Sequence, residues 1–160
     1  MIRPIRSSDA AAICSIYNYY IENSCATFEE TPLGVGEMEE RIHAICADYP
    51  YLVWEDGGEI LGYAYAHRWK DRSAYRHTAE FSLYVRNGFH GRGLGHALTE
   101  ALLTEIRKMN IHAVVSGIVL PNDGCIAIHE KLGFRKISHF SEVGYKFSKW
   151  LDVGYWELIL

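Results

Sequence analysis

At the centre of the chain stands the segment Phe81-Ser-Leu-Tyr-Val-Arg-Asn-Gly-Phe-His-Gly-Arg-Gly-Leu-Gly95. It continues a β-rich run that begins at Thr78, and it opens a long pattern in which leucines and isoleucines recur at the spacing of one helix face. A glycine-rich turn before a helix directs unpaired backbone N–H groups and the positive end of the helix dipole at one place. The segment therefore predicts a strand, a turn suited to binding phosphate and a helix.

Two common nucleotide-binding motifs do not fit this turn. A P-loop requires a Gly-Lys pair, and no glycine of the chain is followed by lysine. A Rossmann fingerprint requires Gly-x-Gly-x-x-Gly, but the last position is His96 when counted from Gly91 and Leu98 when counted from Gly93. The turn is therefore predicted to bind a phosphate of a different kind of ligand.

Hydrophobic periodicity and turn residues place further elements on both sides of the turn. Asp56-Gly-Gly58 lies between two β-rich runs and predicts an antiparallel hairpin. The pattern predicts an α/β fold with a mixed sheet in the order βααβββαβαββ. The expected elements are strands at 2–5, 51–54, 60–65, 78–85 and 113–120, helices from Ala12 to Tyr20, 37–46, 94–109 and 122–132, and two aromatic-rich strands at the end.

The length and composition indicate one globular domain spanning residues 1–160. A domain usually contains roughly 100 to 200 residues, and 49% of these residues are hydrophobic, which is enough for one well-packed core. The net charge is −4, so the chain lacks the overall positive charge of nucleic-acid-binding proteins and of proteins that bind anionic membranes. Any anion site is therefore expected to be local, and neither nucleic acid nor a membrane is expected as a partner.

No segment is predicted to cross a membrane or to bind a metal. The longest apolar stretch, Ile111 to Leu120, is far shorter than the roughly 20 residues of a membrane helix. The first ten residues lack the apolar run of a secretory signal, which favours a cytoplasmic location. The four cysteines form no C-x-x-C pair and are expected to be free thiols. His129-Glu130 is followed by Gly133 where a zinc-binding His-Glu-x-x-His motif requires histidine.

Two motifs, in the correct order, resemble those of the GCN5-related N-acetyltransferase (GNAT) family. The first is His90-Gly-Arg-Gly-Leu-Gly95, which resembles the family's pyrophosphate loop, with histidine where the family usually has arginine or glutamine. The second is Asn122-Asp-Gly-Cys-Ile-Ala-Ile-His-Glu-Lys-Leu-Gly-Phe134, in which an asparagine opens a helix and Leu-Gly-Phe ends it. The resemblance implies acetyl-CoA as cosubstrate and a GNAT fold, with a mixed, mostly antiparallel central sheet flanked by helices.

Within this family, several shorter segments resemble the branch that acetylates phosphinothricin and methionine sulfoximine. The most specific is the C-terminal region, which contains Gly144-Tyr-Lys-Phe147 and Trp150-Leu-Asp-Val-Gly-Tyr-Trp156. The others are Thr78-Ala-Glu80, Leu120-Pro-Asn-Asp123 and His129-Glu130. The resemblance covers most of the chain and also implies a homodimer, for which the aromatic residues Tyr145, Phe147 and Trp150 are candidate contacts.

The resemblance assigns the cofactor-binding and catalytic positions. Backbone groups at the end of the strand are expected to hold the pantetheine arm, and those of the turn to receive the pyrophosphate. The implied cofactor-binding residues are Val85, Arg86, His90, Gly91, Arg92, Gly93, Leu94, Gly95, His96 and Asn122. Acetyl transfer requires a neutral amine, and the resemblance makes Glu80 the base that removes its proton. His129 stands where many family members have a proton-donating tyrosine, and it is expected to assist proton movement.

The expected acceptor is a small amino-acid-like amine. The segment His67 to His77 holds four of the sixteen Lys and Arg residues, which makes a cationic loop in an acidic protein. A guanidinium there is able to bind a carboxylate or a phosphinate in a two-pronged geometry, although such a loop is equally often only solvated. Candidate substrate-binding residues are Phe28, Arg72, Tyr75 and Arg76.

These inferences predict an acetyl-CoA-dependent N-acetyltransferase in which the amine attacks the thioester directly. No cysteine lies in a motif that indicates an acyl carrier, so no covalent enzyme intermediate is expected. Two alternatives remain open at this point. In the first, the acceptor is a protein amino terminus, a ribosomal protein or an aminoglycoside. In the second, the protein binds acetyl-CoA as a sensor without turnover. Glu80 and His129 together argue against the sensor.

Overall fold

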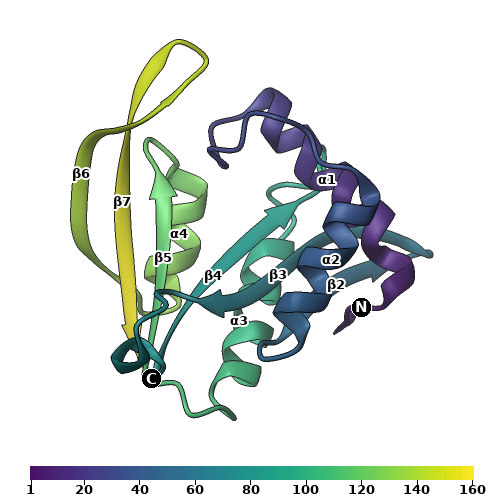
Figure 1. Cartoon of the computed structure of the whole chain (residues 1–160), viewed down its shortest axis with the longest axis horizontal. Helices are drawn as coiled ribbons and strands as arrows, with labels where there is room; N and C mark the ends of the chain where they lie inside the picture. The colour runs from purple at the N-terminus through teal and green to yellow at the C-terminus, as the bar shows by residue number, and fades with distance from the viewer.

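The computed structural model describes all 160 residues, and its element order is the predicted βααβββαβαββ (Figure 1). The four α-helices are α1 (Ala10–Asn23), α2 (Val35–Cys46), α3 (Leu94–Ile106) and α4 (Asp123–Lys131). The seven strands are β1 (Ile2–Pro4), β2 (Tyr51–Asp56), β3 (Glu59–Arg68), β4 (Thr78–Val85), β5 (Ala113–Val119), β6 (Arg135–Lys146) and β7 (Lys149–Ile159). Short 3-10 turns at Ser7–Asp9 and Ser73–Tyr75 precede α1 and β4.

All seven strands form one mixed sheet in the order β1-β2-β3-β4-β5-β7-β6. Every neighbouring pair is antiparallel except β4 and β5, which are parallel. The fold class expected from the sequence is therefore confirmed. Gly57 and Gly58 make the β2–β3 turn, and both have positive φ, as a two-residue hairpin turn requires.

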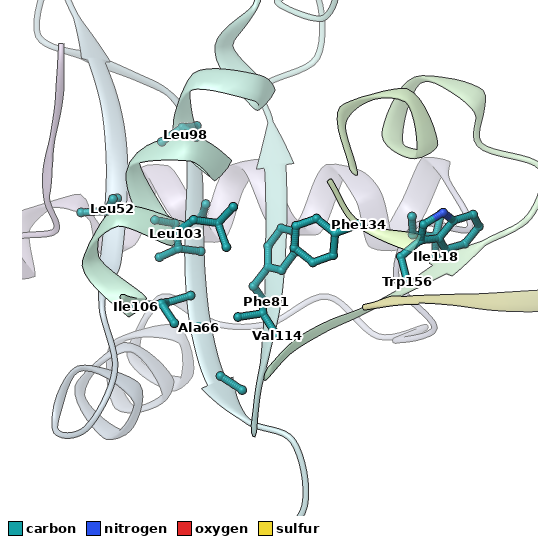
Figure 2. Packing of buried hydrophobic residues seen from close by; sticks show 13 residues of the cluster. Leu52, Ala66, Phe81, Leu98, Leu103, Ile106, Val114, Ile118, Phe134 and Trp156 are labelled. Atoms are coloured by element: carbon teal, nitrogen blue, oxygen red, sulfur yellow. The ribbon is translucent and has the colours of Figure 1, made fainter. Parts of the chain in front are cut away.

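Alternation along the strands produces two hydrophobic layers, one on each face of the sheet. In β2, Val53 packs with α1 and α2, whereas Leu52 packs on the opposite face with α3. Phe81, Phe134 and Trp156 extend this second layer toward β5 and β7 (Figure 2). The helix pair α1–α2 and the helix α3 therefore hold the central strands between them.

The parallel ladder between β4 and β5 is only three residues long. It pairs Thr78–Glu80 with Ala113–Val115 and then stops, although both strands continue. Beyond Glu80, β4 still pairs with β3, and β5 still pairs with β7. The two strands therefore diverge in the middle of the sheet, and the edges that face each other there have no strand partner.

The predicted glycine-rich turn lies between β4 and α3. Gly91 and Gly93 have φ values of 74° and 82°, which L side chains rarely adopt. Gly93 is the N-cap of α3, and no side chain caps the helix there. The first-turn N–H groups of α3 are therefore left without a side-chain acceptor.

No helix is both long and apolar enough to span a bilayer.

We expect Leu98→Ala to destabilise the protein by about 2 to 5 kcal/mol, because the Leu98 side chain is fully buried between α3 and the sheet and its truncation leaves a cavity. Urea unfolding followed by circular dichroism measures this change. Leu98→Met nearly conserves the volume and is the control, with an expected cost below about 1.5 kcal/mol. Equal costs for the two variants would contradict tight packing of α3.

Candidate active site

A long cleft of about 800 Å³ runs from the glycine turn to the diverging ends of β4 and β5. Thirteen of its 23 lining residues are hydrophobic, and one end of the cleft is formed by the N-terminus of α3. The sequence-predicted residues that line it are Val85, His90, Gly91, Gly93, Leu94, Gly95, His96 and Asn122. An uncapped helix N-terminus beside an apolar channel fits a ligand with a phosphate at one end and a long chain at the other.

Gly95 allows α3 to approach the sheet closely at the start of this cleft. A Cβ atom on Gly95 would lie 3.0 Å from Ile128 Cδ1 and 3.3 Å from Leu83 Cδ2. Arg92 is exposed and does not line the cleft, and its guanidinium lies 4.7 Å from the centre of the Phe89 ring. A side chain at position 95 would therefore require Ile128 and Leu83 to shift, whereas Gly91 and Gly93 are favoured by their positive φ.

Tyr20 of α1 fixes the end of β4 in the cleft, and the sequence analysis missed this residue. Its hydroxyl donates a hydrogen bond to the carbonyl of Val85 and lies 2.7 Å from His90 Nε2. Since the hydroxyl proton goes to Val85, His90 is the donor in the second hydrogen bond. His90 is exposed and borders the cleft, where a protonated imidazole would favour an anion.

Arg86, whose backbone was expected to help hold the pantetheine arm, does not line the cleft. Its backbone N–H donates to the carbonyl of Leu61 in β3 at 2.8 Å. Its side chain pairs with the exposed carboxylate of Glu59 at 3.0 Å and lines a separate polar pocket beside α1. Both the backbone N–H and the side chain of Arg86 are therefore engaged away from the cleft.

Between the diverging strands β4 and β5 lies a small cavity of about 80 Å³, which we call the splay cavity. His129 of α4 lines it, and this side chain is 1% exposed. Its Nδ1 lies 2.7 Å from the carbonyl of Cys125, so Nδ1 carries the proton and Nε2 carries a lone pair when the ring is neutral. Nε2 has no hydrogen-bond partner in the protein.

The surroundings of His129 favour its neutral form. Its ring stacks on Phe81, with centroids 5.1 Å apart, and meets the edge of Phe134 at 5.2 Å. Burial lowers the pKa of His129, and the hydrogen bond to the Cys125 carbonyl opposes this effect only in part. A buried, neutral imidazole therefore presents an unshared lone pair to the splay cavity.

Asn122 closes the same region from the N-terminus of α4. Its side-chain oxygen accepts a hydrogen bond from the backbone N–H of Cys125 at 3.2 Å, which makes Asn122 the predicted N-cap. The cap occupies the oxygen and leaves the amide N–H₂ group available. Asn122 lines both the long cleft and the splay cavity.

Glu80 lines a third cavity, of about 430 Å³, which we call the side cavity. Its half-buried carboxylate lies at the last residue pair of the β4–β5 ladder. Burial raises the pKa of Glu80, while His67, the backbone N–H of Gly117 and Lys70 oppose the increase. The other lining residues are Ala26, Phe28, Gly117, Val119, Phe140, Val143, Val153 and Tyr155.

The sequence-predicted substrate residues are only partly brought together. Phe28 lines the side cavity. Arg72, Tyr75 and Arg76 do not line any of the three cavities, because the short 3-10 turn folds them onto their own loop. There Arg72 lies 5.5 Å from the centre of the Tyr75 ring, and Arg76 donates to the carbonyl of Ser73 at 3.1 Å.

Two residues line all three cavities: Val119 of β5 and Ala26. Ala26 lies in the segment between α1 and α2, for which the sequence indicated no function beyond Phe28. Gly117 and Tyr155 are further lining residues that the sequence did not reveal, since they belong to regular strand patterns. Within the structure, no group of three or more His, Cys, Asp or Glu residues is placed to hold a metal ion.

Comparisons with known proteins agree with this geometry. Residues 2–154 match the family model described as an acetyltransferase (GNAT) domain. The chain is 38% identical to a phosphinothricin N-acetyltransferase of Streptomyces viridochromogenes, over 98% of this chain and 85% of the relative. It is 36% identical to an L-methionine sulfoximine/L-methionine sulfone acetyltransferase of Pseudomonas paraeruginosa, over 99% and 94%.

A solved structure from Salmonella typhimurium, described as yncA, a putative acetyltransferase with its cofactor acetyl-CoA, superposes with a TM-score of 0.98. It is 34% identical in sequence and covers 100% of this chain and 93% of that one. The family model and the sequence similarity to named N-acetyltransferases establish the family of this chain, and the cavities and the uncapped N-terminus of α3 agree with it. The chain belongs to the GNAT family and is an N-acetyltransferase.

Proposed function

We propose that this protein transfers the acetyl group of acetyl-CoA to the primary amine of a small amino-acid-like substrate, of the phosphinothricin, methionine sulfoximine or methionine sulfone type. One observation carries the proposal: the long cleft and the side cavity of Glu80 both reach the divergence of β4 and β5 and share Ala26. A donor in the cleft and an amine in the side cavity would therefore meet beside Glu80.

The long cleft fits acetyl-CoA, which supplies an activated acetyl group as a thioester. The N–H groups at the start of α3, between Gly91 and His96, would receive the pyrophosphate, and the imidazole of His90 borders the same end of the cleft. The unpaired edge of β4 that leads to Val85 suits the amides of the pantetheine arm, because it offers backbone groups without a strand partner. The free amide N–H₂ of Asn122 would donate to the same arm.

Glu80 would act as the general base. An ammonium group has no lone pair, so one proton must leave before the nitrogen attacks the thioester carbonyl. The raised pKa brings the carboxylate closer to neutrality and makes it a better base, while its partners His67, Gly117 and Lys70 keep the charged form accessible. The proton would pass from the amine to Glu80, directly or through a water molecule.

His129 would hold a proton at Nε2 on the donor side of the same gap. Because the ring is neutral with Nδ1 protonated, Nε2 would first accept the second proton, which the attacking nitrogen loses as the amide forms, and then deliver it to the departing sulfur. A thiol with a pKa of about 8.5 is a fair leaving group without such help. We therefore expect the contribution of His129 to be smaller than that of Glu80.

The charge beside the side cavity favours an acceptor that has an anionic group next to its amine. Lys70 and His67 act on Glu80 from the cationic loop and the adjoining strand. The same positive charge would attract a carboxylate or a phosphinate. The apolar wall that includes Phe28 and Val153 would accept the rest of a short side chain.

A second copy of the chain would cover the exposed apolar side chains of the β6–β7 hairpin, and we propose a homodimer. Six large hydrophobic residues there are between 50% and 64% exposed, and their sheet edge is unpaired. They are Ile137, Phe140, Val143, Tyr145, Phe147 and Trp150.

The acceptor class is tested by release of free CoA thiol from acetyl-CoA. We expect turnover with phosphinothricin, methionine sulfoximine or methionine sulfone, and none above background with an aminoglycoside or a peptide amino terminus. Turnover with the peptide alone would replace the proposed acceptor. Binding of CoA without thiol release for any acceptor would favour the sensor.

Glu80→Gln tests the base. We expect kcat to fall by about 10²- to 10⁴-fold, since the amide cannot accept the proton, while calorimetry finds an unchanged Kd for CoA. In the wild type, kcat/KM should fall as the pH drops through the raised pKa of Glu80, because protonation removes the base. His129→Phe is the comparison, with a smaller loss and the same acid limb. An unaltered pH profile in Glu80→Gln would remove this assignment.

Light scattering on the purified protein tests the homodimer. For the wild type we expect a mass about twice the 18.3 kDa of one chain. For Trp150→Glu, which places a charge in the exposed apolar surface, we expect the mass of a single chain. A wild-type mass of one chain at micromolar concentration would contradict the proposal.

A further inference from the structure

Lys146 is a fully buried lysine without a carboxylate partner. It lies at the end of β6, directly before the turn to β7, and is 1% exposed. Its Nζ donates hydrogen bonds to the carbonyls of Ser24 at 2.7 Å and Thr27 at 2.8 Å, and it lies 3.5 Å from the carbonyl of Tyr20. Three carbonyl oxygens thus face the three protons of the ammonium group.

The end of α1 provides an unusual environment in which this buried charge is tolerated. An unpaired buried ammonium is strongly destabilising, and lysine is rarely fully buried. The carbonyls of Tyr20 and Ser24 belong to the last turn and the C-cap of α1, where the helix dipole is negative. Charge-assisted hydrogen bonds to these oxygens offset the loss of hydration.

The carbonyls that Lys146 binds lie on both sides of Ala26. Ser24 precedes Ala26 by two residues and Thr27 follows it, so the backbone that carries Ala26 is held at both ends. Ala26 lines the long cleft, the splay cavity and the side cavity. In Figure 1 the segment after α1 and the β6–β7 hairpin lie on either side of the C-terminal end of β5.

A second contact from the same strand holds the next residue of this segment. Gly144, two residues before Lys146, packs directly against the ring of Phe28. A Cβ atom on Gly144 would lie 2.2 Å from Phe28 Cζ, so no other residue fits without displacing the ring. The motif Gly144-Tyr-Lys-Phe147, to which the proposed chemistry assigns no role, therefore holds residues 24–28 through both the backbone and the Phe28 side chain.

We infer that Lys146 is a positioning residue, which fixes the 24–28 segment as the shared wall where the acetyl donor and the amine acceptor meet. The effect on turnover rests on the proposed function, whereas the hold on the segment does not. A displacement of about 1 Å at a reacting centre costs up to about 100-fold in rate. Lys146 should therefore govern kcat and the KM for the amine while it leaves the pyrophosphate end of the cleft unaffected.

The test compares Lys146→Met, which nearly conserves length and volume but donates no hydrogen bond, with Lys108→Met, which removes an exposed lysine distant from the cavities. Amide hydrogen–deuterium exchange of residues 24–28 should be about tenfold faster or more in Lys146→Met, because the segment opens more often once its carbonyls lose the ammonium that holds them. We expect kcat/KM for the amine to fall by about 10- to 100-fold. The Kd for CoA should stay within about threefold.

Gly144→Ala displaces the same segment without removing the ammonium, and it decides the question if Lys146→Met does not fold. Its kcat/KM for the amine should fall in the same direction, with wild-type affinity for CoA. Wild-type exchange and wild-type kcat/KM in a folded Lys146→Met or Gly144→Ala protein would overturn the inference.

The two proposals fail in different ways. If the wild type acetylates none of the amino-acid analogues, the proposed substrate class is wrong, but faster exchange at residues 24–28 in Lys146→Met would still confirm that Lys146 holds this segment. If the wild type acetylates them and Lys146→Met matches Lys108→Met in every readout, Lys146 has no positioning role.

Discussion

The divergence of β4 from β5 is the constraint on which the rest of the site depends. The two strands share three residue pairs, and the ladder ends at Glu80. Because β4 remains paired with β3 and β5 remains paired with β7, the sheet stays continuous on both sides of the gap between β4 and β5. Backbone groups that would be satisfied in a continuous sheet are left free at the centre of the protein, where a chain-like ligand with amides is able to satisfy them.

Polar groups around this opening are held by partners from distant parts of the chain. Tyr20 of α1 binds the carbonyl at the end of β4, and the Cys125 carbonyl fixes the tautomer of His129. Lys146 of β6 binds the backbone at the end of α1. Each group is buried or partly buried, so its loss would leave an unsatisfied partner in a place of low polarity. The opening is therefore surrounded by side chains with few alternative orientations.

The regular elements were predictable because their signals are local. The β2–β3 turn needs two residues with positive φ, and Gly57-Gly58 provides them. The strand from Thr78 to Val85 and the N-cap at Asn122 also lie where the sequence placed them. The contacts of Arg86 could not be found in this way. The resemblance assigns its backbone to the pantetheine arm, but only the structure shows that its N–H donates to Leu61 of β3 and that its side chain pairs with Glu59.

The sequence by itself determined the order of the elements, the glycine conformation before α3 and the family, since each depends on residue types at fixed spacing. Only the tertiary structure decided which side chains meet. Ala26, Glu80 and His129 are separated by about 50 residues from one to the next, and no local pattern relates them. Lys146 appears in the sequence as one charge in a surface hairpin, and it becomes a buried anchor only because the end of α1 brings carbonyl oxygens to it. Contacts between residues far apart in the sequence depend on the relative positions of the strands and helices, and the packing of the whole sheet sets these positions.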